Sequence, residues 1–90
     1  MQDQDIQQEI LDSCLLSLMD NHEAPKGHNN WVTLSCSIEE REAVQEFRAY
    51  QVAQGWMVRT FGDGLRLTEK GYLQHLPRAR FLRTKGVIAS

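Results

Sequence analysis

Few residues of this chain stand in a spacing that supports catalysis or metal binding. Cys14 and Cys36 have neither C-x-x-C spacing nor a histidine-rich neighbourhood, and each lies beside apolar residues, which predicts two buried, reduced thiols. His22 and His28 flank a polar segment with no cysteine nearby and only scattered carboxylates, which predicts no metal site. The sequence has no nucleophile elbow, no glycine-rich phosphate loop and no HExxH motif. We therefore expect no enzymatic activity, no metal and no cofactor.

Arginine is the residue type whose placement suggests a function. Arg59 and Arg66 lie on either side of the turn formers Gly62, Asp63 and Gly64. A second basic group follows Pro77 and consists of Arg78, Arg80, Arg83 and Lys85. Cationic side chains of this kind contact phosphate, and such contacts position a protein on DNA without reading its sequence. The pattern predicts phosphate contacts from a hairpin and from a C-terminal arm.

The two halves of the chain carry opposite charge. Residues 1–47 hold ten acidic and two basic residues, a net charge of −8, whereas residues 48–90 hold eight basic and two acidic residues, a net charge of +6. The formal net charge of the whole chain is only −2. This asymmetry suits either a basic face for a polyanion or two subunits that meet acidic patch to basic patch.

The first elements that must position these residues are a helix, a loop and a strand. Apolar residues recur at the helical period from Ile6 to Met19, which predicts an amphipathic helix. Asp5 is its expected cap, with Gln8 as the capping-box partner, and its expected end lies near Asp20 or Asn21. Residues 21–30 are dense in turn formers and predict an exposed loop, and residues 31–35 (WVTLS) predict a short strand.

A second helix is predicted over residues 38–54. Ser37 with Glu40 forms a capping-box pattern before it, and Gly55 is a natural stop after it. The expected core face of this helix consists of Ala43, Val44, Phe47 and Tyr50. The nearly opposite side carries a thin apolar stripe of Ile38, Ala49 and Val52, a candidate interaction surface.

A β-hairpin and a last helix complete the chain. We expect a two-residue loop within Gly62–Gly64, because a three-residue loop would mix polar and apolar side chains on both faces. This register predicts one face with Val58, Thr60, Leu65 and Leu67 and the other with Arg59, Phe61 and Arg66.

Thr68 is the predicted cap of the last helix, and Leu67 before it is expected to pack on Tyr72. Leu73 and Leu76 should face inward and His75 should lie on the surface. Pro77 is the expected end of the helix.

The element order and the segment GLRLTEKGYLQHL together resemble the winged-helix fold of bacterial regulators such as the MarR and PadR families, whose wing commonly runs into an LTxKG segment. The likeness spans residues 5–76, and its specific part is residues 62–73. It implies a small winged-helix-like α+β domain over residues 1–76. Residues 77–90 would then be a basic tail that is either docked or a free arm.

The resemblance also implies roles for individual residues. Arg59 and Arg66 would be the wing contacts to the DNA backbone or minor groove, and residues 42–54, which include Arg48, would be the recognition helix. The chain departs from the family here, because residues 38–54 contain no break between two short helices. Arg41, Gln45 and Arg48 are the only good donors on the solvent side of this helix, beside a crowd of acidic residues: Glu39, Glu40, Glu42 and Glu46.

Two functions are therefore expected as alternatives. The first is a DNA-binding accessory or transcriptional regulatory protein that uses Arg48, Arg59, Arg66, Arg78, Arg80, Arg83 and Lys85. The second is a protein interaction or dimerisation module without DNA binding, in which Ile38, Ala49 and Val52 form one edge of the interface. In that case the basic arm would meet the acidic half of a neighbouring subunit.

The expected setting is the cytoplasm. No apolar run approaches the roughly 20 residues that a membrane span requires. The acidic, glutamine-rich N-terminus is also unlike a signal peptide. We expect no membrane association, and we expect a homodimer or a protein partner beside DNA.

Overall fold

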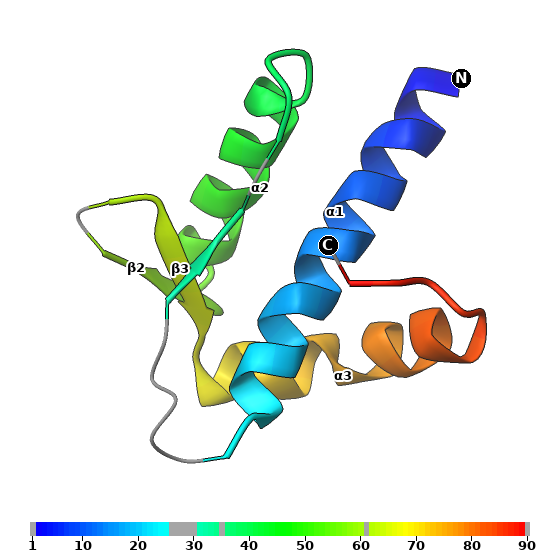
Figure 1. Ribbon diagram of the computed structural model, residues 1–90. Coiled ribbons are helices and arrows are strands. Elements are labelled where there is room, and N and C mark those ends of the chain that lie inside the picture. Colours follow the sequence, from blue (N-terminus) through cyan, green and yellow to red (C-terminus); the bar gives the residue numbers. More distant parts are fainter. Residues whose placement is uncertain (1, 26–30, 35, 61, 90) are drawn as a thin grey trace.

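The computed structural model describes residues 2–25, 31–34, 36–60 and 62–89, and in the N-terminal helix it describes side chains from Gln8 onward. These residues form the helices α1 (Gln2–Glu23), α2 (Arg41–Ala53) and α3 (Glu69–Thr84) and the strands β1 (Val32–Thr33), β2 (Met57–Arg59) and β3 (Gly64–Leu67). The strands make one antiparallel sheet in the order β1-β3-β2. Figure 1 shows α1 and α3 crossing below the sheet, with α2 above it. The predicted α+β class and the predicted order of elements are confirmed.

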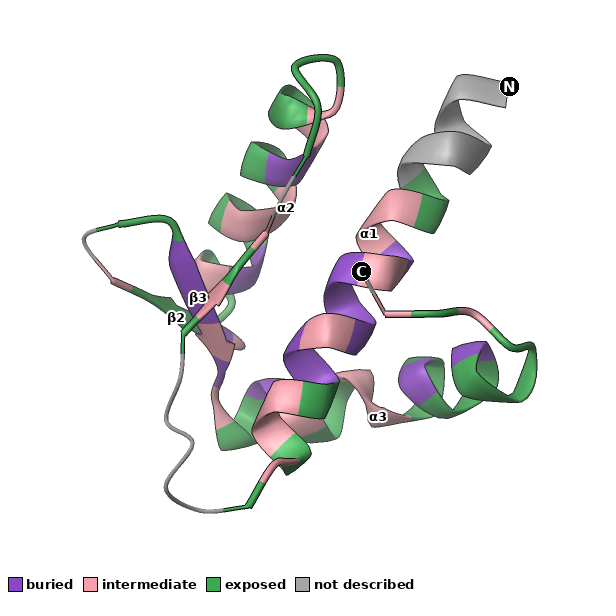
Figure 2. Ribbon diagram, viewed as in Figure 1, coloured by how far each residue is buried: buried purple, intermediate pink, exposed green. Residues whose placement is uncertain are grey.

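The core lies where α1, β3 and α3 meet. Its centre consists of residues with almost no exposed surface: Leu16, Leu18 and Met19 from α1 and Leu65 from β3. Ala79 and Leu82 of α3 close it from the other side. Figure 2 shows this buried band running along the inner side of α1 and across β3. The apolar stripe predicted for the first helix is therefore the main wall of the core.

Helix α1 is longer than predicted at both ends. It begins at Gln2, before the expected cap at Asp5, whose side chain lies outside the described residues. It ends at Glu23, past the expected end near Asp20 or Asn21. Residues 20–23 contain no glycine or proline to end the helix. A contact with α3 also stabilises this last turn, because His22 stacks on Tyr72 with ring centroids 4.5 Å apart. Tertiary contacts thus extend the helix beyond its apolar stripe.

Helix α2 begins three residues later than predicted. Glu40 Oε1 accepts the backbone N–H of Ser37 at 2.8 Å, which is one half of the expected capping box. However, Glu40 and Arg41 donate their backbone N–H groups to Ser37 and Ile38, so residues 38–40 form a turn instead of the first helical turn. The helix proper starts at Arg41.

The predicted end of α2 at Gly55 is confirmed. Gly55 has φ +77, a left-handed conformation that glycine adopts without the strain imposed by a side chain. Its N–H bonds Val52 O, and the N–H of Trp56 bonds Gln51 O, each at 3.0 Å. These two bonds are those of a Schellman motif, which satisfies carbonyls at the end of the helix.

The core face of α2 is rotated relative to the prediction. Val44 is buried and Phe47 packs on the core as expected, but Tyr50 is 56% exposed and the prediction for it is wrong. Val52, expected on the outer side, packs against the core. Gln51 is buried in place of Tyr50. Its Oε1 accepts a hydrogen bond from Nε2 of His75 at 2.6 Å, which compensates the burial of this amide.

His75 is half-buried against α2 and so differs from the predicted surface residue. Its ring meets that of Trp56 edge-on, with centroids 5.2 Å apart. Burial lowers the pKa of His75, which favours the neutral ring that donates to Gln51. The contact joins the middle of α3 to the end of α2.

The hairpin has a three-residue loop, so the predicted register is wrong. Met57 pairs with Leu67, Val58 with Arg66 and Arg59 with Leu65. Thr60 N–H also bonds Gly64 O at 3.1 Å, so three residues separate the last paired positions. Directly paired residues share a face, so Arg59 lies on the face of Leu65 and Leu67, and Arg66 lies on the opposite face with Val58. The position predicted for Phe61 lies outside the described residues.

The LTEKG segment is a structural joint. Thr68 accepts the N–H of Gly71 at 3.0 Å, which confirms it as the cap of α3, and its hydroxyl donates to Gly55 O at 2.8 Å. Its own N–H bonds Trp56 O at 3.0 Å. Gly71 lies against the same backbone, where a Cβ atom would overlap the carbonyl of Trp56. The threonine and the glycine thus fix the start of α3 on the turn that ends α2.

Helix α3 does not end at Pro77, as predicted, but continues to Thr84. Proline removes one hydrogen bond from a helix interior, yet Ala79 and Leu82 beyond it are buried against α1, and this packing holds the second half in place. Leu76 packs on the core as expected, whereas Leu73 is 60% exposed, contrary to prediction. The division between a domain and a tail at residue 77 therefore falls inside α3.

The close contact at Gly71 gives a stability prediction. Gly71→Ala should destabilise the fold by about 3 kcal/mol, because the added methyl group must displace the backbone at Trp56. Gly62→Ala is the control, because a Cβ atom there meets nothing within 4 Å, and its effect should stay within about 0.5 kcal/mol. Urea unfolding of both variants measures the difference. Equal stability of the two variants would contradict this placement of α3.

Candidate functional site

The basic residues beyond Pro77 are largely engaged within the chain. Arg78 NH2 lies 2.8 Å from Asp12 Oδ2, and its Nε lies 3.4 Å from Oδ1 of the same carboxylate. Asp12 is buried on α1 and also accepts a hydrogen bond from Gln8 at 3.0 Å. Arg78 thus compensates a buried negative charge, and its part in a phosphate clamp stays a prediction.

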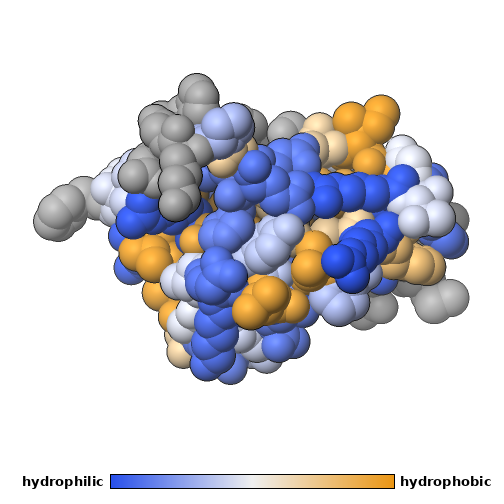
Figure 3. Space-filling view, turned by 90° about the horizontal axis from the view of Figure 1, so that it is seen from below, coloured by the Kyte–Doolittle hydropathy of each residue, from blue (hydrophilic) through white to orange (hydrophobic). Residues whose placement is uncertain are grey.

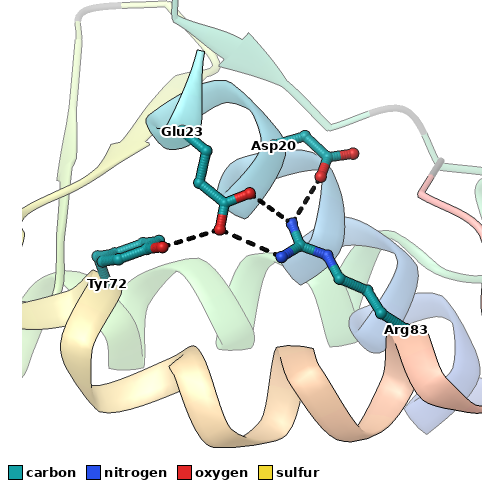
Figure 4. A network of polar contacts seen from close by, with 4 residues as sticks. All are labelled: Asp20, Glu23, Tyr72 and Arg83. Carbon is teal, nitrogen blue, oxygen red and sulfur yellow. Dashed lines mark hydrogen bonds and ion pairs between the residues drawn. The ribbon is translucent and has the colours of Figure 1, made fainter.

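Arg83 is the centre of a second set of ion pairs, shown in Figure 4. Its NH2 group lies 2.7 Å from Asp20 Oδ1 and 2.9 Å from Glu23 Oε1, and its NH1 group lies 3.1 Å from Glu23 Oε2. The hydroxyl of Tyr72 donates to Glu23 at 2.8 Å. Hydrogen bonding from Arg83 lowers the pKa of Glu23, and the bond to Glu23 raises the pKa of Tyr72. This network ties the end of α1 to α3.

The charge asymmetry of the sequence is therefore satisfied in part inside one molecule. Acidic residues of α1 face basic residues of α3, where we had expected a polyanion or a second subunit. Of the four predicted clamp residues, Arg80 and Lys85 stay exposed, and no ion pair joins either one to the described part of the chain. Lys85 lies over the ring of Phe81, with Nζ 5.1 Å from its centroid.

The two hairpin arginines are separated by the sheet. The guanidinium carbon of Arg66 lies 4.6 Å from the ring centroid of Trp31, which precedes β1 on the outer face. Arg59 is exposed, and its pairing with Leu65 places it on the other face of the hairpin. They do not form the single pair of wing contacts that the sequence predicted.

A polar cleft lies between α2 and the hairpin, and we call it the arginine cleft. It consists of two adjoining hollows, of about 710 Å³ and about 540 Å³, which share Arg48 and Asp63 in their walls. The larger hollow is also lined by Trp31, Arg59, Thr60 and Gly62. The smaller hollow is also lined by Thr33, Leu34, Cys36, Arg41, Val44 and Gln45. Three arginines and one aspartate are the charged residues of these described walls.

Helical spacing explains how α2 lines this cleft. Arg41, Gln45 and Arg48 are separated by four and three residues, which places them in one row along the helix. Val52 continues the row by four further residues and packs on the core. The row is therefore closed by the core at its C-terminal end and open to solvent at Arg41, which is exposed.

Arg48 lies where the two hollows meet and has only a weak ion-pair partner there. Its side chain is only 15% exposed, and its Nε is buried without a hydrogen-bond partner among the described residues. Its NH2 group lies 3.6 Å from Asp63 Oδ1, and the Asp63 side chain is 78% exposed. An ion pair this long and open to water is weak, so an incoming anion can compete with Asp63 for Arg48.

The glutamates of α2 do not line the cleft. Glu42 and Glu46 are exposed, and their helical positions lie roughly 100° or more around the helix from the row of Arg41 and Arg48. They lie farther around the helix, on its exposed side and outside both hollows. The arginines of α2 and these glutamates therefore occupy different sides of the same helix.

The cysteines differ from the prediction. Cys14 is buried, as predicted, but Cys36 is exposed at the wall of the smaller hollow, and neither forms a disulfide. Cys36 lies between β1 and the turn that precedes α2, outside both elements, which agrees with its exposure.

The predicted interaction stripe is not one surface. Ile38 is 80% exposed in the turn before α2 and Ala49 is exposed on the helix, whereas Val52 packs against the core. The start of α2 at Arg41 removes Ile38 from the helix, which breaks the expected alignment.

Other kinds of site find no support among the residues that are described. Within them, no group of three or more histidine, cysteine or acidic side chains is arranged to hold a metal ion. His28 lies outside the described residues, and His22 contacts Glu69 at 3.5 Å. No helix in the described ranges has the length and apolar character needed to cross a membrane.

Comparisons of the chain with known protein families, with curated proteins and with solved structures found no match. The likeness to winged-helix regulators therefore rests on the order of elements and on the LTEKG segment.

Sequence reasoning identified Arg48 and Arg59 but did not bring them together. It also missed Trp31 and Asp63 as cleft residues. A signal was present in the donors Arg41, Gln45 and Arg48, whose spacing marks one row on α2. The partner of that row depends on the hairpin register, which the sequence did not settle.

The Asp12–Arg78 pair gives a second stability prediction. Arg78→Ala should cost about 2 kcal/mol, because it leaves a buried carboxylate without its charge partner. Arg80→Ala removes an exposed arginine two positions away on the same helix and should stay within about 0.5 kcal/mol. Urea unfolding at neutral pH and low salt compares the two. A loss as large in the Arg80 variant would show that general charge, and not the pair, is responsible.

Proposed function

We propose that this chain is a DNA-binding accessory or regulatory protein that holds DNA phosphates in the arginine cleft. The observation that carries the proposal is the position of Arg48, a largely buried arginine with an unpartnered Nε, between Arg41 and Arg59. Guanidinium groups present several donors in a fixed geometry that matches phosphate. Several guanidinium groups along one cleft can contact successive phosphates of a nucleic-acid backbone.

The cleft also contains a group that phosphate would displace. Asp63 is the acidic residue in the described walls, and it is held only by the 3.6 Å contact with Arg48. Because Asp63 is exposed, it can turn to water when an anion arrives, at little energetic cost. Arg48 would then exchange a weak partner for a stronger, charge-assisted hydrogen bond.

The proposal assigns different roles to the arginines than the sequence did. Arg41, Arg48 and Arg59 bind phosphate, and Arg66 supports the site from the outer face through Trp31. Arg78 and Arg83 hold α1 on α3. The resemblance to winged-helix regulators agrees with a hairpin beside the binding site, although similarity of fold by itself does not establish function.

A protein interaction module is the second candidate, and α3 provides the observation that favours it. Leu73 is 60% exposed and Phe81 is 49% exposed on this helix. Figure 3 views the molecule from the side of α3, where hydrophobic residues lie as separate islands among hydrophilic ones. Scattered apolar groups of this kind are common on monomeric proteins, so they support the candidate less than the cleft supports DNA binding.

The test of DNA binding is a charge-matched pair of variants. Fluorescence anisotropy with labelled DNA of mixed sequence, duplex and single-stranded in parallel, would be measured at about 50 and 200 mM salt. Arg48→Gln with Arg59→Gln should weaken binding at least tenfold at the lower salt. The dependence of log K on log salt should become shallower by about 1.4 to 1.8 in slope, as expected when two phosphate contacts are lost.

Arg80→Gln with Lys85→Gln is the control, because it removes the same charge from exposed positions outside the cleft. This variant should bind DNA nearly as the unmodified protein does. Equal losses in both variants would place binding on total charge and contradict a site in the cleft. No binding of either DNA form at the lower salt would reject the proposed function, and an interaction module would then be the better account.

A further inference from the structure

We infer that the arginine cleft takes single-stranded DNA, with one base stacked on Trp31 and the adjoining phosphate held by Arg48. This inference rests on the proposed function and names the form of DNA that the site accepts. It starts from an aromatic residue that the contacts with phosphate do not explain.

Trp31 combines exposure with a fixed orientation. It is 38% exposed and lines the larger hollow together with Arg48 and Arg59. Its ring is held by Arg66, whose guanidinium carbon lies 4.6 Å from the ring centroid. An indole ring fixed in this way is a platform for an unpaired base, and a stacked base gains favourable energy without a requirement for its sequence.

The size and composition of the hollow agree with a nucleotide. Its volume of about 710 Å³ lies within the usual range for small-molecule sites. An indole ring stands in the same wall as two guanidinium groups, one of which has an unpartnered buried Nε. The indole suits a base and the guanidinium groups suit a phosphate.

The acidic side of α2 argues against a duplex in the same position. A duplex carries two rows of phosphates, whereas the positive row of Arg41 and Arg48 is one side chain wide. Glu42 and Glu46 are exposed farther around the same helix. A second strand that lies over the exposed side of α2 would approach these carboxylates, while a single strand can follow the arginines alone.

Close packing behind Trp31 keeps the platform in place. A Cβ atom at Gly64 would come within 2.7 Å of Trp31 Cβ and 2.9 Å of Thr60 Cγ2. A side chain at position 64 would therefore displace Trp31 or Thr60. At Gly64 the hairpin pairs with β1, next to the wall of the larger hollow.

Trp31 can report its own binding. The chain has two tryptophans, so Trp56→Phe leaves Trp31 as the single emitter. Titration with an oligothymidylate of about ten nucleotides, within the length range that single-strand sites cover, should quench its fluorescence. Trp31→Leu, measured by anisotropy, should lower the affinity for this strand about tenfold or more, and Trp31→Phe should restore part of it. Circular dichroism confirms that each variant is folded, and the unmodified protein is titrated in parallel.

Each outcome decides between the proposals. Quenching of Trp31 by the single strand, with weaker binding of a duplex of equal length and a loss in Trp31→Leu, would support the inference. Binding of DNA without a loss in Trp31→Leu, or equal binding of both forms, would overturn the inference and leave the proposed function standing. Absence of binding to either form at about 50 mM salt would overturn both.

Discussion

The structure depends on the joint between the end of α2 and the start of α3. Thr68 bonds the backbone of Trp56 and Gly55, and Gly71 allows α3 to lie directly on the Trp56 carbonyl. This joint sets the direction in which α3 leaves the sheet, so that Ala79 and Leu82 reach α1. The same turn connects α2 to β2, the two elements on either side of the cleft.

Charge is divided between two tasks. Arg78 and Arg83 neutralise carboxylates of α1 and hold the two long helices together. Arg41, Arg48 and Arg59 face a cleft that contains only Asp63 as an opposing charge in its described walls. The net charge of −2 therefore does not describe the surface offered to a partner. A paired arginine stabilises the fold, whereas an underpaired one keeps donors available for a ligand.

Local signals predicted the elements, and long-range contacts decided the site. The cap at Thr68 and the stop at Gly55 were predictable because each depends on residues close in sequence. The hairpin register was not, because the choice between loops of two and three residues depends on which face the core accepts. That single step placed Arg59 and Arg66 on opposite faces. The helix end predicted at Pro77 was wrong, since the packing of buried residues beyond it outweighs the loss of one hydrogen bond.

The most direct measurement of the central claim is the reactivity of Cys36 in the presence of DNA. Cys36 lines the cleft and is exposed, whereas Cys14 is 1% exposed, so a thiol reagent should modify Cys36 first. Saturating DNA should slow this reaction strongly. A cysteine introduced as Arg80→Cys in a Cys36→Ser background should react at the same rate with and without DNA. An unchanged rate at Cys36, with DNA bound as shown by anisotropy on the same sample, would contradict binding in the cleft.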